Sequence, residues 1–475
     1  MRSHGVGAAV LALLLTGASH AGATIEASAT LDPFGEVALY RESTHPTRVV
    51  LLLSDADGWG RAEVESARAI ASLDALVVGV DVRRYLATMA ERGSDELYPS
   101  ADLEVLSQFV QKKMRLPTYL PPIVCGQAAG ATLAYAVAAQ AHPTSFAGAI
   151  SLGFCPEVAV PKPLGRGSGL LWDAGAATGT YVLRPATALA APWVVLQGHA
   201  HPGCEVTEVR RFVDAAPGAV LVELPTHEPV VDPEWWLPGV RHALERMGGA
   251  QTTNAPVAGE IGDLPLVEVP ARGTPTALAV ILSGDGGWAS LDREVGDALA
   301  ASGVGVVGLN SLSYFWTTRT PDGAAADLAR VLRHYRDAWH VSRVVLIGYS
   351  RGADVLPFLA SRLPAELRST VQLIALLGPV RTTDFEFHLT DWLGGNDPTA
   401  LPIAPEVEKL RDLRLLCVQG EQEDDSLCPT LDATLAHRFV LPGAHHFGGD
   451  YGVIAARILA EAGAPAQPSL GNAPP

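Results

Sequence analysis

Residues 344–352 read VVLIGYSRG, an apolar run that leads into a serine flanked by glycines. Consecutive apolar residues predict a buried β-strand, and the Ala/Leu-rich segment 353–362 predicts a helix directly after it. A G-x-S-x-G sequence between a strand and a helix is typical of a sharp turn whose small residues let the chain pass close to itself. Such a turn holds a side chain clear of the sheet, so Ser350 is the predicted nucleophile.

The same order of segments occurs twice in the chain. In each copy, short apolar runs alternate with Ala/Leu/Arg-rich segments of helical length, which predicts a mostly parallel sheet with helices on both faces. We therefore expect two tandem α/β-hydrolase-like domains. The matching segments, first copy before second, are 51–59 (LLLSDADGW) and 281–288 (ILSGDGGW), 122–130 (PIVCGQAAG) and 344–352, and 224–227 (LPTH) and 441–445 (LPGAH).

Local composition divides the chain further. We predict a signal peptide at 1–21, because Arg2 precedes a short apolar stretch and a small-residue cleavage site, SHA, ends it. This favours export to the periplasm; a buried N-terminal strand or helix is the alternative. The predicted domains are 22–247 and 263–462, joined by a Gly/Ala/Thr/Pro-rich linker at 248–262 and followed by a flexible tail at 463–475.

Length and charge exclude several classes of protein. With 475 residues, 48% of them hydrophobic and 18% charged, the chain can build two full cores and is not generally disordered. Its 34 Lys and Arg against 51 Asp and Glu give a net charge of −17, which argues against nucleic-acid binding. No later stretch reaches the length of about 18 apolar residues that a transmembrane helix needs.

Five cysteines fit an oxidising compartment. Cys155 and Cys204 lie in the first half and Cys417 and Cys428 in the second, so one disulfide per half is permitted, with Cys125 as a buried thiol. The alternative is five reduced cysteines. No cysteine or histidine spacing indicates zinc, and we expect neither a metal nor a cofactor.

A serine nucleophile needs a base, and the base needs an acid to orient it. One later predicted strand ends in a carboxylate-rich loop, EQEDDS (421–426). The next ends in a histidine turn, PGAHHF (442–447). The order serine, acid, histidine is that of α/β-hydrolases. We predict His445 as the general base and Asp424 as its orienting acid; one-residue rivals are Asp425 and His446. The alternative is an ordinary surface cluster of carboxylates beside a loop histidine pair.

A glycine-rich turn, SGDGGW (283–288), follows the first strong strand of the second copy. Hydrolases of this type place one donor of the oxyanion hole in such a turn and the other directly after the nucleophile. We predict that the backbone N–H of Asp285 or Gly286 acts together with that of Arg351. A tight turn without a catalytic role is the alternative.

The first copy lacks this chemistry. Ala128 stands where the nucleophile belongs, and GHAH (198–201) replaces the acidic loop, although His227 occupies the histidine position. Because alanine offers nothing to activate, we predict a catalytically silent domain that serves packing, partner contact or substrate presentation.

Two other features compete for a functional interpretation. Residues 303–308 (GVGVVG) satisfy the dinucleotide-binding pattern G-x-G-x-x-G, but their valines predict a buried strand instead. Residues 382–410, which mix aromatic and acidic side chains, occupy a position where hydrolases often carry a lid. They could equally form an ordinary packed loop and helix.

Five ordered motifs of the second copy match those of one known family: LSGDGGW (282–288), GYSRGAD (348–354), FEFH (385–388) with Trp392, EDDSLCP (423–429) and LPGAHHFGGD (441–450). Over roughly 262–462 the chain resembles the bacterial VirJ/AcvB virulence-protein family, and its two-copy length is similar to that of AcvB. The resemblance implies a periplasmic serine hydrolase of Gram-negative bacteria that cleaves aminoacyl-phosphatidylglycerol, lysyl-phosphatidylglycerol above all. It also implies a link to virulence and type IV secretion.

A lysyl ester carries two ammonium groups, which carboxylates near the site would attract. The candidates for this role are Asp285, Asp354, Glu386 and Glu423. Two other functions stay open: a non-catalytic periplasmic scaffold or binding protein at a secretion apparatus, and a hydrolase that acts on a soluble ester.

Overall fold

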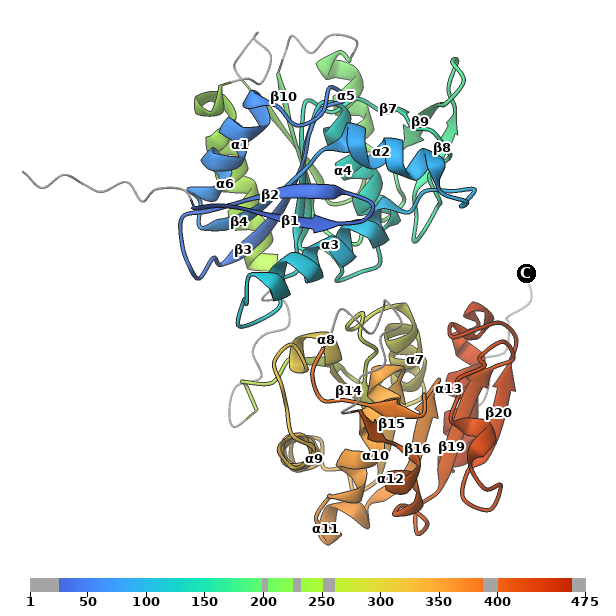
Figure 1. The fold of residues 1–475 in the computed structure, drawn as a ribbon. Coiled ribbons are helices and arrows are strands. Elements are labelled where there is room, and N and C mark those ends of the chain that lie inside the picture. The colour runs from blue at the N-terminus through green and yellow to red at the C-terminus, as the bar shows by residue number, and fades with distance from the viewer. Residues whose placement is uncertain (1–24, 199–203, 225–231, 251–260, 388–399, 464–475) are drawn as a thin grey trace, which may run out of the picture.

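A computed structural model describes residues 25–198, 204–224, 232–250, 261–387 and 400–463. Two α/β units follow one another in the chain, each with a main sheet between layers of helices (Figure 1). The predicted signal peptide, most of the predicted linker and all but the first residue of the predicted tail lie outside the described residues.

The first unit is built on an eight-stranded sheet with the order β1-β2-β4-β3-β5-β6-β10-β11. β2 runs antiparallel to both of its neighbours, whereas the other pairs are parallel. The strands are β1 (Ile25–Leu31), β2 (Gly35–Arg41), β3 (Arg48–Leu53), β4 (Ala75–Val80), β5 (Ile123–Gln127), β6 (Gly148–Leu152), β10 (Trp193–Gly198) and β11 (Ala219–Leu224). A small antiparallel sheet contains β7 (Glu157–Ala159), β8 (Leu171–Ala174) and β9 (Thr180–Arg184).

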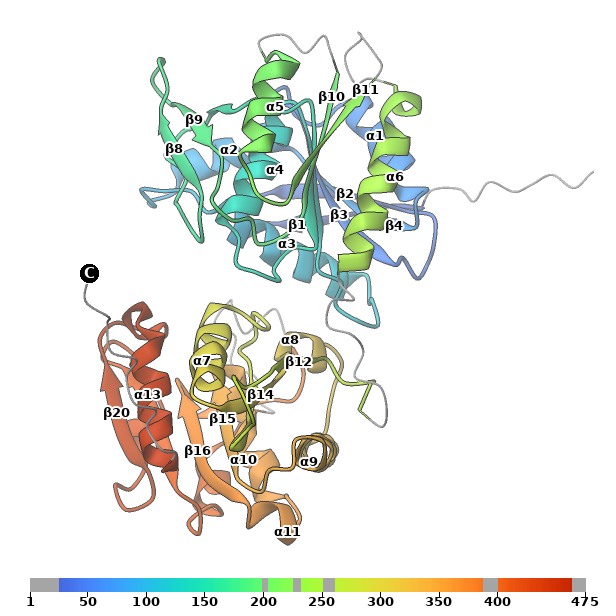
Figure 2. The same ribbon diagram turned by 180° about the vertical axis from the view of Figure 1, so that it is seen from behind.

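Helices cover both faces of this sheet. One face packs against α1 (Arg61–Ala71) and α6 (Pro233–Ala250), which lie side by side in Figure 2. The opposite face packs against α2 (Val82–Glu91), α3 (Pro99–Lys113), α4 (Ala129–Gln140) and α5 (Val206–Asp214).

The second unit is built on a seven-stranded sheet with the order β12-β14-β13-β15-β16-β19-β20. β12 is antiparallel to β14, and all other pairs are parallel. The strands are β12 (Leu266–Val269), β13 (Ala277–Leu282), β14 (Val304–Leu309), β15 (Val344–Tyr349), β16 (Val371–Leu377), β19 (Leu415–Gly420) and β20 (His437–Leu441). β17 (Thr382–Thr383) and β18 (Leu401–Pro402) pair separately.

Two helical layers enclose this sheet as well. α7 (Ser290–Ala301) and α13 (Tyr451–Ala462) pack on one face. The other face carries α9 (Pro321–Ala338), α10 (Arg351–Ser361), α11 (Ala365–Arg368) and α12 (Ala404–Glu408), with α8 (Ser311–Tyr314) following β14. Short 3₁₀ helices are η3 (Cys428–Thr430) and η4 (Phe447–Gly449).

The two sheets repeat one topology. From β2 to β11 the strand order and directions of the first sheet match those of the second from β12 to β20, with β1 as an addition. The prediction of two tandem α/β-hydrolase-like domains is therefore confirmed. Helices cover the central strands on both faces, so every residue of β15, for example, is buried. Such strands are recognisable in the sequence as continuous apolar runs. Residues 304–308 belong to buried strand β14, in agreement with the non-dinucleotide interpretation.

Equivalent side-chain contacts recur in both units. Trp59 packs on Gly79 and Trp288 on Gly308, so closely that a methyl group on either glycine would lie within 2.3 Å of the indole ring. A tyrosine hydroxyl donates to an aspartate at 2.7 Å in each unit, Tyr85 to Asp102 and Tyr314 to Asp327. Shared topology and shared contacts together indicate a duplication.

The described cysteines follow the arrangement of one disulfide per half. Cys155 is bonded to Cys204 and Cys417 to Cys428, whereas Cys125 is a free, buried thiol. These bonds are consistent with an extracytoplasmic protein. Among the described helices, none has the length and apolar character to cross a bilayer.

Candidate active site

Ser350 occupies a sharp turn between β15 and α10. Its φ of 51° and ψ of −121° lie outside the regions that a non-glycine residue normally adopts. The flanking glycines make this turn possible: a methyl group on Gly348 would lie 2.3 Å from the carbonyl oxygen of Gly352, and one on Gly352 would lie 2.0 Å from that of Leu282. The predicted strand, turn and helix around Ser350 are therefore present.

Ser350 lines a pocket of about 1120 Å³ at the carboxyl ends of the second sheet. Open α/β sheets place their ligand sites at this edge. The lining residues that matter here are Ser350, His445, Asp285, Arg351, Asp354, Asp384, Glu423, Asp424 and Asp425. Residues of four of the five sequence motifs, far apart in the chain, thus meet in one place.

His445 is held by Glu423. The imidazole Nδ1 lies 2.5 Å from Glu423 Oε1, and only 7% of the glutamate side chain is exposed. The other carboxylate oxygen accepts the N–H of Gly420 at 2.6 Å, which fixes the glutamate in turn. When Nδ1 donates to the carboxylate, Nε2 is left as the basic nitrogen, as a general base requires.

The prediction that Asp424 or Asp425 orients the imidazole does not agree with these contacts. Both aspartates line the pocket, but the carboxylate bonded to His445 is that of Glu423, which had been predicted to bind substrate. The tight turn after β19 explains the shift, because the Gly420 N–H draws the Glu423 side chain back toward the end of the strand.

Of the two candidate bases, His445 is the one whose contacts and position suit the role. His446 Nδ1 lies 3.1 Å from the hydroxyl of Tyr349, and among the described residues only His445 of the pair lines the pocket. Tyr349 also stacks on the His445 ring at 5.4 Å between centroids. The His445 ring also lies against Gly378, which has a φ of 64°. A methyl group at that position would come within 2.8 Å of the ring atom Cε1, so a side chain there would displace the imidazole.

Opposing effects set the pKa of His445. Burial lowers this pKa, but the hydrogen bond and charge of Glu423, with smaller contributions from Asp354 and Asp285, outweigh burial and raise it above its usual value. Burial, followed by the charge of His445, instead lowers the pKa of His446. The two neighbouring imidazoles therefore differ in basicity.

Asp354 lies on the first turn of α10, inside the pocket. Its carboxylate accepts the N–H of Val380 at 2.8 Å, and burial raises its pKa to about 7 despite that bond and the charge of Arg351. The predicted substrate-binding position of Asp354 is thus part of the pocket. Glu386 is different: it is not among the described lining residues, and its carboxylate pairs with Lys112 of the first domain.

The predicted oxyanion donors flank the nucleophile. Residues 284–287 form a tight turn in which the Gly287 N–H donates to the Gly284 carbonyl at 3.1 Å. A methyl group on Gly284 would lie 3.4 Å from Cβ of Ser350, so this turn lies directly against the nucleophile. Arg351 is the first residue of α10, where backbone N–H groups lack helical acceptors, and its guanidinium is bonded to Asp384 at 3.0 Å.

The first domain keeps the turn but not its chemistry. Ala128 has φ 46° and ψ −108°, close to the values of Ser350. The N–H of the next residue, Ala129, donates to the carboxylate of Asp55 at 3.1 Å. Asp55 occupies the position of Gly284, so a side-chain carboxylate fills the place of an oxyanion. His227 and residues 199–201 of the replaced acidic loop lie outside the described residues.

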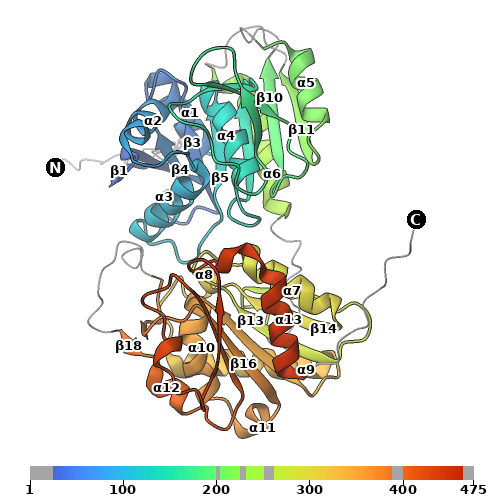
Figure 3. The same cartoon turned by 90° about the vertical axis from the view of Figure 1, so that its right-hand side faces the viewer.

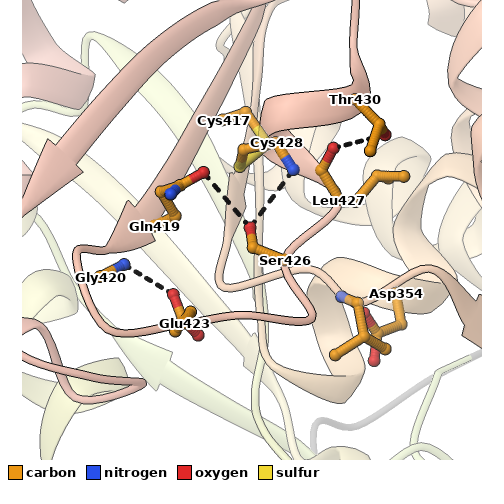
Figure 4. Close-up of a disulfide and its surroundings, with 10 residues drawn as sticks. Asp354, Cys417, Gln419, Gly420, Glu423, Ser426, Leu427, Cys428 and Thr430 are labelled. Carbon is orange, nitrogen blue, oxygen red and sulfur yellow. Dashed lines mark hydrogen bonds between the residues drawn. A yellow bond between two sulfur atoms is a disulfide. The ribbon is translucent and has the colours of Figure 1, made fainter.

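The Cys417–Cys428 disulfide closes the loop that carries Glu423 (Figure 4). It joins β19 to η3 across a sequence separation of 11. Within the loop, the Ser426 hydroxyl lies 3.5 Å from Gln419 Oε1 and accepts the N–H of Cys428 at 3.3 Å. These bonds restrict the loop from which the acid reaches His445.

The described part of residues 382–410 borders the pocket. Thr382, Thr383, Asp384 and Ala400 line it, next to the pairing of β17 with β18. The central residues of the predicted lid, among them His388 and Trp392, lie outside the described residues. In the described part of the chain, no group of three or more histidine, cysteine or acidic side chains is arranged to hold a metal ion.

The fold is of the α/β-hydrolase type. Residues 276–464 match the family described as "Bacterial virulence protein (VirJ)", in agreement with the resemblance that the motifs predicted. The comparison with curated proteins finds no match.

Solved structures similar to this chain include several hydrolases. Est1E from Butyrivibrio proteoclasticus is 15% identical with a TM-score of 0.33, and the match covers 42% of this chain and 93% of that one. A putative dienelactone hydrolase from Klebsiella pneumoniae is 15% identical with a TM-score of 0.33, covering 47% and 97%. A serine hydrolase without lid from Xanthomonas campestris is 17% identical with a TM-score of 0.28, covering 43% and 90%.

Replacing Glu423 with glutamine tests the role of this acid. A base must be neutral, so ester hydrolysis by the wild type should rise with pH through an apparent pKa above the usual histidine value. Glu423→Gln removes the charge that raises this pKa, so the rise should move to lower pH while kcat falls on the order of 10³-fold. Asp424→Asn is the control: measured with an uncharged soluble ester, it should change neither kcat nor the pH at which the rate rises. A larger loss of kcat in Asp424→Asn than in Glu423→Gln would identify Asp424 as the orienting acid.

Gly284→Asp should reproduce the arrangement found in the first domain. The new carboxylate would accept the Arg351 N–H as Asp55 accepts that of Ala129, and kcat/KM should fall by about 10²-fold or more. Gly284→Ala adds the same Cβ without an acceptor and should retain at least about ten times more activity than the aspartate variant. Equal losses in both variants would show that crowding, not occupation of the oxyanion hole, is responsible.

The disulfide near Glu423 should support both stability and activity. Replacing Cys417 and Cys428 with serine opens a short loop, which should lower the free energy of unfolding by about 3 kcal/mol and reduce kcat. The matched Cys155/Cys204 double variant removes the other disulfide and should leave kcat nearly unchanged. Calorimetry and ester hydrolysis measure the two effects; unchanged kcat in the first variant would contradict a role for this disulfide in holding the acid.

Proposed function

We propose that the second domain is a serine esterase that cleaves the aminoacyl ester of aminoacyl-phosphatidylglycerol, with lysyl-phosphatidylglycerol as the preferred lipid. Ser350 is the nucleophile, His445 the general base and Glu423 the orienting acid. The observation that carries this proposal is the 2.5 Å contact between His445 and the buried Glu423, in the same pocket as a serine held at φ 51°.

The chemistry is acyl transfer in two steps. His445 takes the proton of Ser350 as the oxygen attacks the ester carbonyl, and the oxyanion is stabilised by the backbone N–H of Arg351 and by the turn at 285–286. The bond to the lipid glycerol then breaks, and the imidazolium returns the proton to the leaving alcohol. Water, activated by His445, hydrolyses the aminoacyl serine and releases the free amino acid.

Charge in the pocket supports a cationic acyl group. Asp285, Asp424 and Asp425 line the pocket together with Asp354, whereas the charge of Arg351 is compensated by Asp384. A lysyl ester brings two ammonium groups to these carboxylates, and an alanyl ester brings one. The preference for lysine rests on this difference.

The two disulfides and the predicted signal peptide support a location in the periplasm, where the outer leaflet of the inner membrane presents such lipids. The plugged site around Ala128 and Asp55 supports a first domain without turnover of its own. Contact with components of a secretion system is part of the same proposal.

Hydrolysis of purified lipid tests the proposal. The full chain is mixed with phosphatidylglycerol vesicles containing lysyl-phosphatidylglycerol, and released lysine is measured. Ser350→Ala should lower the rate by about 10³-fold or more with an unchanged circular dichroism spectrum. His227→Ala, at the corresponding histidine of the first domain, should leave the rate nearly unchanged.

Other outcomes separate the competing functions. If the wild type releases no lysine and Ser350→Ala changes nothing, a non-catalytic scaffold is the better account. If the wild type cleaves a soluble ester in a Ser350-dependent manner but not the lipid, the triad stands and the lipid substrate is wrong. Equal rates with lysyl and alanyl lipids would contradict the proposed preference for lysine.

A further inference from the structure

The first domain contacts the second at two places. One contact lies at the end of α3, opposite α8, where the two domains face each other in Figure 3. The other joins residues 142–144 to the beginning of α7. Both contacts involve segments that lead to the predicted oxyanion donors.

An aromatic cluster forms the centre of the first contact. Tyr119 of the first domain packs with Leu312, Trp316 and Phe387 of the second, and all four are less than 9% exposed. The Trp316 indole donates to the Leu116 carbonyl at 2.8 Å, and its ring stacks on that of Phe387. Such burial at a domain boundary holds the segment around Phe387 against the first domain.

Lys112 adds a charged contact beside this cluster. Its ammonium donates to the Trp316 carbonyl at 2.6 Å, lies 3.3 Å from Glu386 Oε1 and sits 4.9 Å from the centre of the Trp316 ring. The lysine side chain is only 19% exposed. A mostly buried ammonium with these partners fixes the position of Glu386.

From Glu386 a short chain of bonds leads to the nucleophile. The Glu386 N–H donates to Asp384 Oδ1 at 3.0 Å, and the same oxygen accepts the Arg351 guanidinium at 3.0 Å. Arg351 follows Ser350 directly, and its backbone N–H is one predicted oxyanion donor. Lys112 of the silent domain is thus connected to this donor through Glu386, Asp384 and Arg351 of the second domain, the link between Glu386 and Asp384 being made by a backbone N–H.

The second contact reaches the other donor. The hydroxyl of Thr144 donates to the Trp288 carbonyl at 2.9 Å, immediately after the turn at 284–287. Thr144 has a φ of 77°, a left-handed conformation that is strained for a β-branched residue and persists only where its surroundings hold it. On α3, burial raises the pKa of Glu104 to about 7 against the hydrogen bond of Ser145, and the charge of Asp285 adds to the rise.

We propose that the silent first domain positions the oxyanion hole of the second, holding its two sides through Thr144 and Lys112. The inference rests on the proposed function. These residues touch neither substrate nor reacting atoms; they act through Trp288 and through the Glu386–Asp384–Arg351 chain. Because an oxyanion hole acts mainly in the transition state, loss of either contact should lower kcat and leave KM nearly unchanged.

Paired substitutions in the full chain test this role. Thr144→Val keeps the shape of the side chain and removes the hydroxyl, and Lys112→Met keeps the stem and removes the ammonium. Each should lower kcat for lysyl-phosphatidylglycerol about tenfold, with KM within about twofold of the wild type. Thr144→Ser retains the donor and should restore kcat. If Thr144→Val fails to fold, Thr144→Gly removes the hydroxyl while relieving the backbone strain.

A matched control separates positioning from general loss of stability. Tyr85→Phe removes the hydrogen bond that Tyr85 donates to Asp102 near the beginning of α3, within the first domain, and should lower the melting temperature without changing kcat. Unchanged kcat in both Thr144→Val and Lys112→Met overturns the inference, and so does an equal loss of kcat in Tyr85→Phe. The activity of Ser350→Ala is measured in the same assay. If this variant retains activity, the proposed function fails. If activity depends on Ser350 but not on Thr144 or Lys112, only the inference about the first domain fails.

Discussion

The close approach of α10 to the end of β13 is the constraint on which the site depends. Gly352 comes so near to the Leu282 carbonyl that no side chain fits there, and Gly348 is equally close to Gly352. This packing forces the intervening residue into a left-handed conformation and presents it at the carboxyl edge of the sheet. The oxyanion turn and His445 are placed around that point by the neighbouring strands.

The duplicated chain shows that this backbone does not by itself make a catalyst. The first domain has the same elbow, yet Ala128 provides no hydroxyl and Asp55 fills the place of an oxyanion. These two side chains leave the first domain without a nucleophile and occupy the position of an oxyanion. A domain without catalytic activity can still be retained for the surface that it presents. Lys112 and Thr144 lie on the surface that contacts the second domain.

Much of this architecture was predictable from sequence because its signals are local. Strands buried on both faces appear as continuous apolar runs, and the glycine spacing around Ser350 reflects contacts within a few residues. The acid was mispredicted because three carboxylates stand in a row, and the choice of Glu423 depends on how the loop curls back to the Gly420 N–H. Glu386 was assigned to the substrate because no local pattern reveals that Lys112, 274 residues away, is its partner.

The central claim is that Ser350 is an activated nucleophile in the native protein. Peptide mass spectrometry after brief exposure to a fluorophosphonate reports this most directly, because the reagent traps only serines whose hydroxyl is activated by a base. We predict one adduct, located at Ser350 and absent after the protein is unfolded before treatment. A folded protein that shows no adduct at this serine would contradict the account.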